Sequence, residues 1–457
     1  MKTVRCLVTF LLLFGLLVQI GCDSSIEKTS ARNNKDFQTF EDWAKVTAVP
    51  VTTTEPGGSY EDLMPLKKII GNAPAVALGE PRHDIHDIFQ FKHRMIEFLV
   101  KEMNFTAFVL ELGFPAGKKI DDYINGGSGP LEEVDTGFNM FFGAYEEVLA
   151  LVQWMRAYND DPANARKLHF YGMDMPGAGT VVMSAVEGAL NYLDTVDPEY
   201  ADSVREVLLP AAEEFNPMKH KDLPAEDRDK LTASIELLVS RFENLRVVYI
   251  AKTSKDEYEW GYRHALSARQ VNTNAITSTS GVSAEIGFNA RERAMADNLR
   301  WIMDREKEQD GRTIIWGHNG HVQKYPIMGF FPNPPTTMGM YMKSFLGDDI
   351  FTIGSTFYKG TLKEVGPIKE EVIKEAKADS TESILMKVGQ PMFILDLNNA
   401  PKTGPVHDWL SQEQEMRVNT LFVKTKLTEA FNALIYLEEV SRAHHTQGAL
   451  QRLNSGK

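Results

Sequence analysis

The chain has 457 residues, a formal net charge of −14 and 43% hydrophobic residues, so it can bury a sizeable core. Its acidic balance argues against nucleic acid or an anionic membrane surface as a partner. The two cysteines are Cys6 and Cys22. If the chain starts with a cleaved leader, the remainder has neither a disulfide nor a thiol metal site.

The first residues have the pattern of an export signal. Lys2 and Arg5 precede a short apolar run over residues 7–21, which Cys22 follows. The run is short for a membrane span. We therefore expect a signal peptide over 1–21, a lipid anchor on Cys22 in the cell envelope and a polar tether over 22–58. Simple cleavage and release of the chain is the alternative.

From residue 59, short apolar runs alternate with amphipathic helical stretches, which is typical of a parallel sheet flanked by helices. The sequence predicts an α/β fold with a central, mostly parallel sheet. We expect a first half of this core over 59–176, a helical insertion over 177–305, and a second half over 306–457 that includes a small α+β part. The expected strands cover 74–80, 106–111, 168–173, 313–316, 349–354, 391–396 and 431–437, and the clearest helices cover 86–103 and 146–158.

Four of these strand-like runs end on an acid or an imidazole. The runs lead into Glu80, Glu111, Asp174 and His318, which lie at or within two residues of the expected strand ends. In an open parallel sheet, ligands bind at the carboxyl ends of the strands. We therefore expect these side chains to meet in one site, where carboxylates and histidines would suit a hydrolytic centre.

Two His-x-x-His pairs follow such strand ends. His83 can be a general base beside Glu80, or it can simply bond to backbone. His318 and His321 can donate protons, stabilise an oxyanion, bind a metal or lie solvated in a turn. Arg291 opens a helix near the return to the sheet, where it can reach substrate or belong to a solvated face.

Absent motifs narrow the choice of enzyme class. The sequence has no Gly-x-Ser-x-Gly elbow, His-Glu-x-x-His helix, P-loop or Gly-x-Gly-x-x-Gly stretch. A serine esterase of the usual α/β type, a zincin, a kinase and a dinucleotide enzyme are therefore disfavoured.

Several stretches together resemble the erythromycin esterase family. They are Leu78-Gly-Glu-Pro-Arg-His83-Asp-Ile-His86, Phe105-Thr-Ala-Phe-Val-Leu-Glu111, Tyr145 to Asn159, Tyr171-Gly-Met-Asp174, Arg291 to Asn298, Trp316-Gly-His-Asn-Gly-His321 and Phe431 to Leu437. The resemblance implies a hydrolase that opens an ester or macrolactone without a covalent serine intermediate and without a cofactor. Its expected ligand is a small-molecule ester or lactone.

The resemblance also implies roles for individual residues. His83 matches the proposed base, and the implied catalytic set is completed by Glu80, Glu111, His318 and His321. Lys92 stands where the family usually has an arginine; it keeps the charge but loses the bidentate fork. We expect substrate contacts from His86, Lys92, Asp174 and Arg291. Two alternatives are a metal-dependent hydrolase using the same His/Glu cluster and a non-catalytic surface lipoprotein that binds a ligand.

Overall fold

The computed structural model describes residues 37–129, 131, 142–176, 182–214, 217–279, 283–329 and 331–455. The expected signal peptide, Cys22 and the first part of the expected tether lie outside these residues. Among the described helices, each is too short or too polar to cross a membrane.

The described strands form a large mixed sheet whose centre is parallel, as expected. The order of the parallel strands is β11 (Ala433–Ser441), β6 (Ile350–Leu362), β2 (Ala75–Glu80), β5 (Thr313–His318), β3 (Ala107–Gly113) and β4 (His169–Asp174). Three short strands pair antiparallel at the periphery: β8 (Met392–Asp396) on β11, β1 (Val49–Pro50) on β8, and β7 (Glu371–Ile373) on β6.

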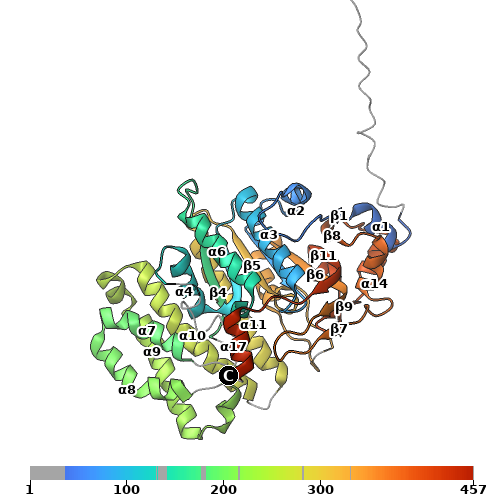
Figure 1. Ribbon diagram of the computed structural model, residues 1–457. Coiled ribbons are helices and arrows are strands. Elements are labelled where there is room, and N and C mark those ends of the chain that lie inside the picture. The colour runs from blue at the N-terminus through green and yellow to red at the C-terminus, as the bar shows by residue number, and fades with distance from the viewer. Residues whose placement is uncertain are drawn as a thin grey trace, which may run out of the picture. The chain divides into compact units, whose positions relative to one another are not determined.

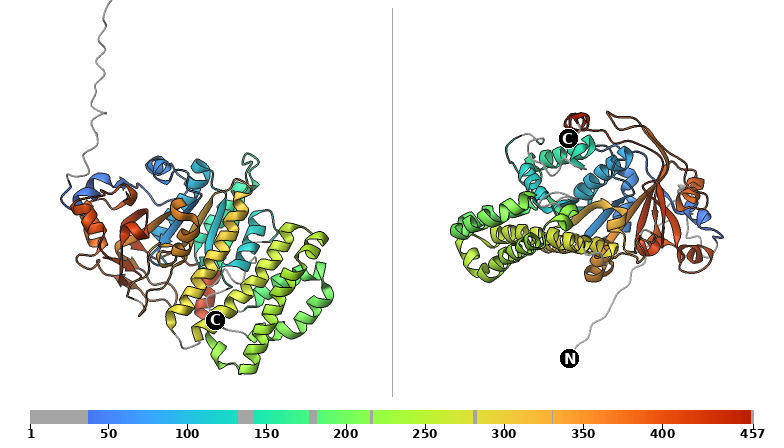
Figure 2. Two further views of the ribbon diagram at one scale, coloured as in Figure 1. Left: turned by 180° about the vertical axis from the view of Figure 1, so that it is seen from behind. Right: turned by 90° about the horizontal axis from the view of Figure 1, so that it is seen from below.

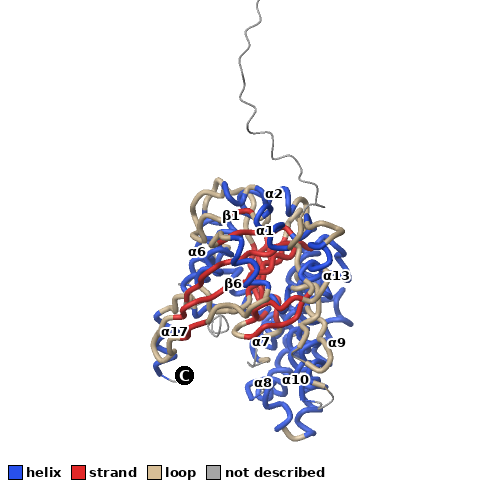
Figure 3. The backbone as a smooth tube through the Cα atoms, turned by 90° about the vertical axis from the view of Figure 1, so that its right-hand side faces the viewer, coloured by secondary structure: helices blue, strands red, loops and turns tan. Residues whose placement is uncertain are grey.

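Helices cover both faces of the sheet, so the central strands are apolar on both sides. Alternate residues of β2 show this: Val76 and Leu78 pack in one core with α3 (His86–Met103) and α6 (Glu146–Asp160). Ala75 and Ala77 pack in another core with α11 (Ala284–Lys307) and α13 (Met338–Leu346). Figure 3 shows the strands between these two layers of helices.

A helical segment joins β4 to β5. Its helices α7 (Met183–Val196), α8 (Pro198–Glu214), α9 (Ala225–Lys252) and α10 (Lys255–Thr279) share a core of their own. They gather beyond β4, next to α4 (Phe114–Ile124), as Figures 1 and 2 show. The last helix of the segment, α11, packs on α10 and also lies against the sheet, which brings its residues to the strand ends.

The structure differs from the expected tether over 22–58, because the chain is packed from Phe37 onward. Helix α1 (Phe40–Thr47) is capped by Thr39, whose hydroxyl accepts a hydrogen bond from the Asp42 amide at 3.0 Å. Trp43 is fully buried, and the Phe40 ring stacks on Trp409 with centroids 4.2 Å apart. These aromatic side chains hold the segment against the outer strand β8.

The remaining elements are short. Strands β9 (Gln414–Val418) and β10 (Leu421–Thr425) form a separate two-stranded sheet. The other helices are α2 (Pro65–Ile70), α12 (Asn319–Val322), α14 (Thr381–Leu385), α15 (Pro405–Leu410), α16 (Leu427–Ala430) and α17 (Gln447–Ser455); the 3-10 turns are η1 (Glu61–Leu63), η2 (Phe142–Ala144), η3 (Pro217–Asp222), η4 (Gly347–Asp349), η5 (Met386–Val388) and η6 (Leu397–Asn399).

Candidate active site

The strand-end residues meet at one edge of the sheet. Glu80 and His318 are register partners across the parallel pair β2–β5. Glu111, from β3 on the other side of β5, accepts a hydrogen bond from the His318 amide at 2.8 Å. The convergence expected from the sequence therefore follows directly from parallel pairing, even though β5 comes much later in the chain than its two neighbours.

A close backbone approach fixes this edge. The Asn319 side chain donates to the Ser355 carbonyl at 2.7 Å, and the Ser355 hydroxyl donates to the Gly79 carbonyl at 2.7 Å. A Cβ atom at Gly79 would stand 2.2 Å from Asn319 Oδ1. Only glycine leaves room for this contact, which ties β2, β6 and the turn after β5 together.

His83 lies in the loop after β2 and is oriented by Glu80. Its Nδ1 is 2.9 Å from Glu80 Oε1, and the carboxylate accepts, so we assign the proton to Nδ1. This assignment leaves the Nε2 lone pair free. Burial lowers the pKa of His83, so the ring is neutral near pH 7. The side chain remains 33% exposed, which lets a substrate or water reach it.

Glu80 is itself fully buried and is supported from behind by Lys92. The Lys92 ammonium contacts Glu80 Oε2, donates to the Leu78 carbonyl at 2.8 Å and lies 4.8 Å from the centre of the Trp316 ring. Burial lowers the pKa of Lys92 well below its ordinary value, and the charge of Glu111 opposes that shift. The expected contact between Lys92 and substrate differs from the structure, since Lys92 is only 2% exposed.

A second group of charges surrounds Glu111. Arg291, from α11, donates to Glu111 Oε1 at 3.0 Å and to Asp174 Oδ2 at 2.6 Å. His321 Nε2 lies 3.1 Å from the same Glu111 oxygen. Burial alone would raise the pKa of Glu111, but His321, His83 and Arg291 hold it well below its usual value. Glu111 is therefore an anion shared by several cationic or polar groups.

His321 is held in its charged form. Its Nδ1 is 2.5 Å from Glu292 Oε1, and the other Glu292 oxygen accepts from the Met338 amide at 2.7 Å. Burial lowers the pKa of His321, but Glu111 and Glu292 outweigh it and raise the pKa to about 10. Its Nε2 lies 3.2 Å from Arg291 Nη1. Since a protonated Nε2 cannot accept, this contact places two cations side by side, stabilised by their carboxylates.

His318 behaves differently from its neighbour. Its Nε2 is 3.0 Å from the Pro81 carbonyl, and its Nδ1 accepts from the Gly320 amide at 3.0 Å. Burial, followed by the nearby His83 and His321, lowers its pKa to about 3. Both nitrogens of this neutral ring are therefore occupied by backbone. In this geometry His318 supports the turn before His83, and its ring offers no free donor.

The cluster is a poor fit for a metal ion. Glu80, His83 and Glu111 each bring one possible ligand atom within 4.8 Å of the others. However, the Lys92 ammonium already contacts Glu80, and Arg291 and His321 already contact Glu111. A divalent cation would have to displace these cations or sit beside them, which opposes its binding.

His86 does not join the site, although a substrate contact was expected. The loop after β2 ends at Ile85, and α3 begins at His86. The side chain points away to α6, where Nδ1 lies 2.5 Å from Glu147 Oε1. Residues three apart across a loop-to-helix boundary do not share a face, so the spacing of His83 and His86 was not a sign of proximity.

Sequence reasoning missed Glu292 as a site residue. Its place directly after Arg291 was a signal, but that stretch also fitted a solvated helix face. Glu292 is instead completely buried. Asp174 and Arg291 lie where a site was expected. Asp174, however, is buried beneath Arg291 and holds the guanidinium in place by accepting its hydrogen bonds.

Comparisons with known proteins agree with this architecture. The family model for erythromycin esterase matches residues 100–440. The erythromycin esterase type II of Escherichia coli is 27% identical over 88% of this chain and 98% of its own length. A crystal structure of a Bacillus cereus protein is 27% identical, with a TM-score of 0.77 over 89% of this chain and 98% of that one.

A further solved structure, a mutant erythromycin esterase in its open conformation, has a TM-score of 0.69. It is 18% identical over 87% of this chain and 98% of that one, and so supports the fold alone. The family match spans most of the sequence and contains Glu111, Asp174, Arg291, His318 and His321. The chain therefore belongs to the erythromycin esterase family and is, at the level of that family, a hydrolase.

Proposed function

We propose that the protein hydrolyses a carboxylic ester or a lactone by direct attack of water, with His83 as the general base. The observation that supports this most is the contrast between two imidazoles that flank Glu111. His83 is neutral, partly exposed and has a free Nε2, whereas His321 is charged. Two neighbouring groups whose pKa values are shifted in opposite directions suit a general base and a partner that acts as an acid or stabilises charge.

In the proposed reaction, His83 Nε2 takes a proton from water as the water oxygen attacks the carbonyl carbon. The carbonyl π pair moves onto oxygen, and the charges of His321 and Arg291 stabilise the oxyanion. When the intermediate collapses, the C–O bond to the leaving group breaks and the His83 imidazolium protonates the departing alkoxide. Each such proton transfer contributes on the order of 10²–10⁴ in rate.

Glu80 holds the His83 ring in the tautomer that this step needs. As the imidazolium forms, Glu80 and Glu111 stabilise it. Lys92 holds Glu80, and Asp174 and Glu292 hold the two cations. His318 keeps the Pro81 turn in place. We propose macrolactones as the first substrate class to test, because the matched Escherichia coli relative is named an erythromycin esterase. Export with a lipid anchor on Cys22 is part of the proposal.

The proposal is tested by incubating the purified protein with a panel of esters and lactones. Product is detected by mass spectrometry as the gain of one water. We expect His83→Ala to lose at least about 10² in kcat/KM and to keep its circular dichroism spectrum. His407→Ala, which removes a partly exposed imidazole far along the chain from the proposed site residues, is the control. Activity of the His83 variant within about tenfold of the wild type would refute the base assignment.

Hydrolysis should also survive extensive chelation, because the cations around Glu80 and Glu111 disfavour a metal there. Loss of turnover on chelation in a protein whose circular dichroism spectrum and thermal midpoint stay unchanged, restored by one ion, would instead make His83 and its acidic neighbours ligands of a catalytic metal.

A further inference from the structure

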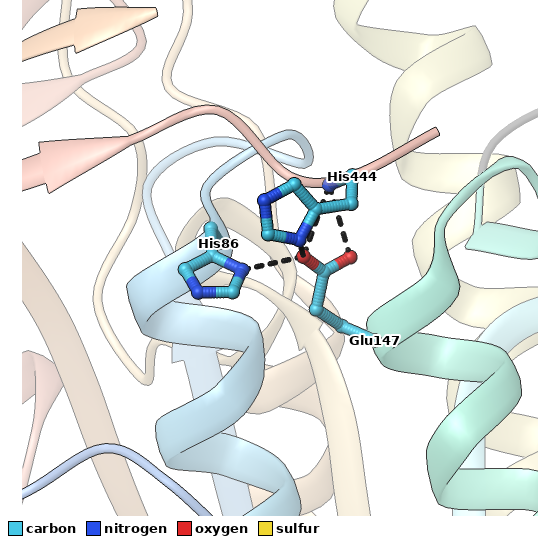
Figure 4. Close-up of side chains that lie close together, drawn as sticks. All are labelled: His86, Glu147 and His444. Carbon is cyan, nitrogen blue, oxygen red and sulfur yellow. Dashed lines mark hydrogen bonds and ion pairs between the residues drawn. The ribbon is translucent and has the colours of Figure 1, made fainter. Parts of the chain in front are cut away.

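A second cluster of ligand-type side chains lies outside the proposed active site. We propose that His86, Glu147 and His444 bind one divalent transition-metal ion, for which Zn²⁺ is the appropriate probe. We call these residues the His–Glu–His cluster. Figure 4 shows them converging from α3, from the first turn of α6 and from the segment that follows β11. One possible ligand atom from each residue lies within 4.8 Å of the others.

The donor atoms are close to the arrangement that zinc needs. Both rings present Nδ1 to the same oxygen, Glu147 Oε1, at 2.5 Å for His86 and 3.1 Å for His444. Ligands at about 2.0–2.1 Å from a tetrahedral Zn²⁺ stand roughly 3.3 Å apart. His444 already fits that spacing, and His86 would have to move by roughly 0.8 Å.

The surroundings favour a cation here more than at the active site. Glu147 is held by the His444 amide, which donates to its two oxygens at 3.0 and 3.2 Å. Asp87 and Glu55 also interact electrostatically with His86. Within the described chain, no lysine or arginine forms an ion pair with Glu147, whereas Lys92 and Arg291 pair with the carboxylates of the active site.

The cluster is also accessible. The His444 side chain is 62% exposed, while Glu147 is almost fully buried. Two histidines and one glutamate, with a solvent-facing side for water, form a ligand set that zinc proteins use. A buried carboxylate provides the fixed ligand, and an exposed imidazole can close on the ion as it enters.

A metal in this position would clamp the C-terminal segment to the loop that carries His83. The Ser441 amide donates to Asp87 Oδ2 at 2.6 Å, and the Ala443 amide donates to the Asp84 carbonyl at 2.9 Å. On the other side, the Glu146 amide donates to the His444 carbonyl at 2.8 Å. The ion would therefore stabilise the fold around the active site without being a reactant.

The experiment uses the purified full-length protein, first stripped with a chelator and then titrated with Zn²⁺ by calorimetry. We expect about one equivalent to bind and the thermal midpoint to rise with Zn²⁺ concentration. His444→Ala, which alters an exposed side chain, should weaken binding by on the order of 100-fold, since even loss of an outer partner of a ligand costs 10–100-fold. His86→Ala should do the same.

Two control variants separate this site from others. His407→Ala removes a partly exposed imidazole that lies 3.4 Å from Asp408, and it should leave Zn²⁺ affinity unchanged. His83→Ala removes the histidine of the other candidate cluster and should also leave it unchanged. Binding that is lost in His83→Ala but kept in His444→Ala would overturn the proposal. So would an absence of binding at millimolar Zn²⁺, which would make the cluster a clamp formed by ion pairs alone.

Discussion

Replacing Glu292 by glutamine should remove one of the two carboxylates that keep His321 charged. The substitution preserves the shape of the side chain, and its amide oxygen can still accept from the Met338 amide, which now bonds to Glu292 at 2.7 Å. What it removes is the negative charge 2.5 Å from His321 Nδ1. Glu111, 3.1 Å from Nε2, remains as the other carboxylate.

The size of the effect follows from the pKa. The two carboxylates raise the pKa of His321 from an ordinary 6.5 to about 10 against the opposing effect of burial. A single adjacent charge shifts a pKa by about 1–3 units, so the pKa of His321 in the variant should be about 8. At pH 9, about nine tenths of the wild-type rings would be protonated and about one tenth in the variant. If charged His321 stabilises the oxyanion, kcat/KM at pH 9 should then fall about tenfold.

The same shift affects stability with a defined sign. The pKa of His321 is higher in the folded protein than in the unfolded chain. Its contribution to the free energy of unfolding is therefore fully present below about pH 6.5 and is lost as the pH rises toward 10. Glu292→Gln should reduce that contribution, so its midpoint in denaturant should be lower than wild type at pH 6 and closer to it at pH 10.

The assay is the alkaline limb of the pH–rate profile on whichever ester proves active, together with NMR titration of the His321 ring. Asp297→Asn is the matched control, since it removes a carboxylate from an exposed position of the same helix. If the alkaline limb and the ring titration of a folded Glu292→Gln protein coincide with those of the wild type, Glu292 does not hold His321 charged.

Three further predictions rest on separate observations. Lys92→Met leaves Glu80 buried without its counter-ion and should cost about 3–5 kcal/mol of unfolding free energy in denaturant; an unchanged midpoint would contradict the ion pair. Because burial lowers the pKa of His83, the acidic limb of kcat/KM should have an apparent pKa below 6.5, and a limb above 6.5 would count against His83 as the free base. Wild type should fractionate with membranes and Cys22→Ala should not; equal membrane association of both would argue against the lipid anchor.

The fold was readable from the sequence where local pattern decides structure. The apolar runs of β2, β3 and β5 are strands paired on both sides, β4 is the edge strand beside β3, and the periodic stretches at 86–103 and near 146–158 are helices. The meeting of Glu80, Glu111 and His318 was also predictable, because parallel strands end at one edge. Insertion of β5 between β2 and β3 was not, since pairing order depends on long-range packing that no local pattern encodes.

Details of the site depend on tertiary contacts, which the spacing of residues along the sequence does not predict. His83 and His86 point to different places because α3 begins at His86. Lys92 is buried behind Glu80 because α3 packs against the sheet. Glu292 becomes a site residue because α11 packs against the sheet as well as against α10. The packed helix α1 was overlooked because its eight residues follow a polar stretch.

The neighbours of the two working histidines also explain why one chain can hold a neutral and a charged imidazole so close together. Both approach Glu111, and each has a second carboxylate of its own: Glu80 for His83 and Glu292 for His321. Burial lowers the pKa of both rings, and the carboxylates outweigh it only at His321. We attribute part of this difference to the groups that contact the second carboxylate of each ring. Lys92 contacts Glu80 and offsets its charge, whereas Glu292 is bound by the neutral Met338 amide and keeps its full effect on His321. On this reasoning Lys92 helps to keep His83 unprotonated, because it weakens the field by which Glu80 would raise the pKa of the ring. Arginine in that place would spread the same charge over a planar fork and would need a different fit beneath Trp316.

Lys92→Met should then do more than destabilise the fold. In any fraction that remains folded, uncompensated Glu80 should raise the pKa of His83 and move the acidic limb of kcat/KM to higher pH.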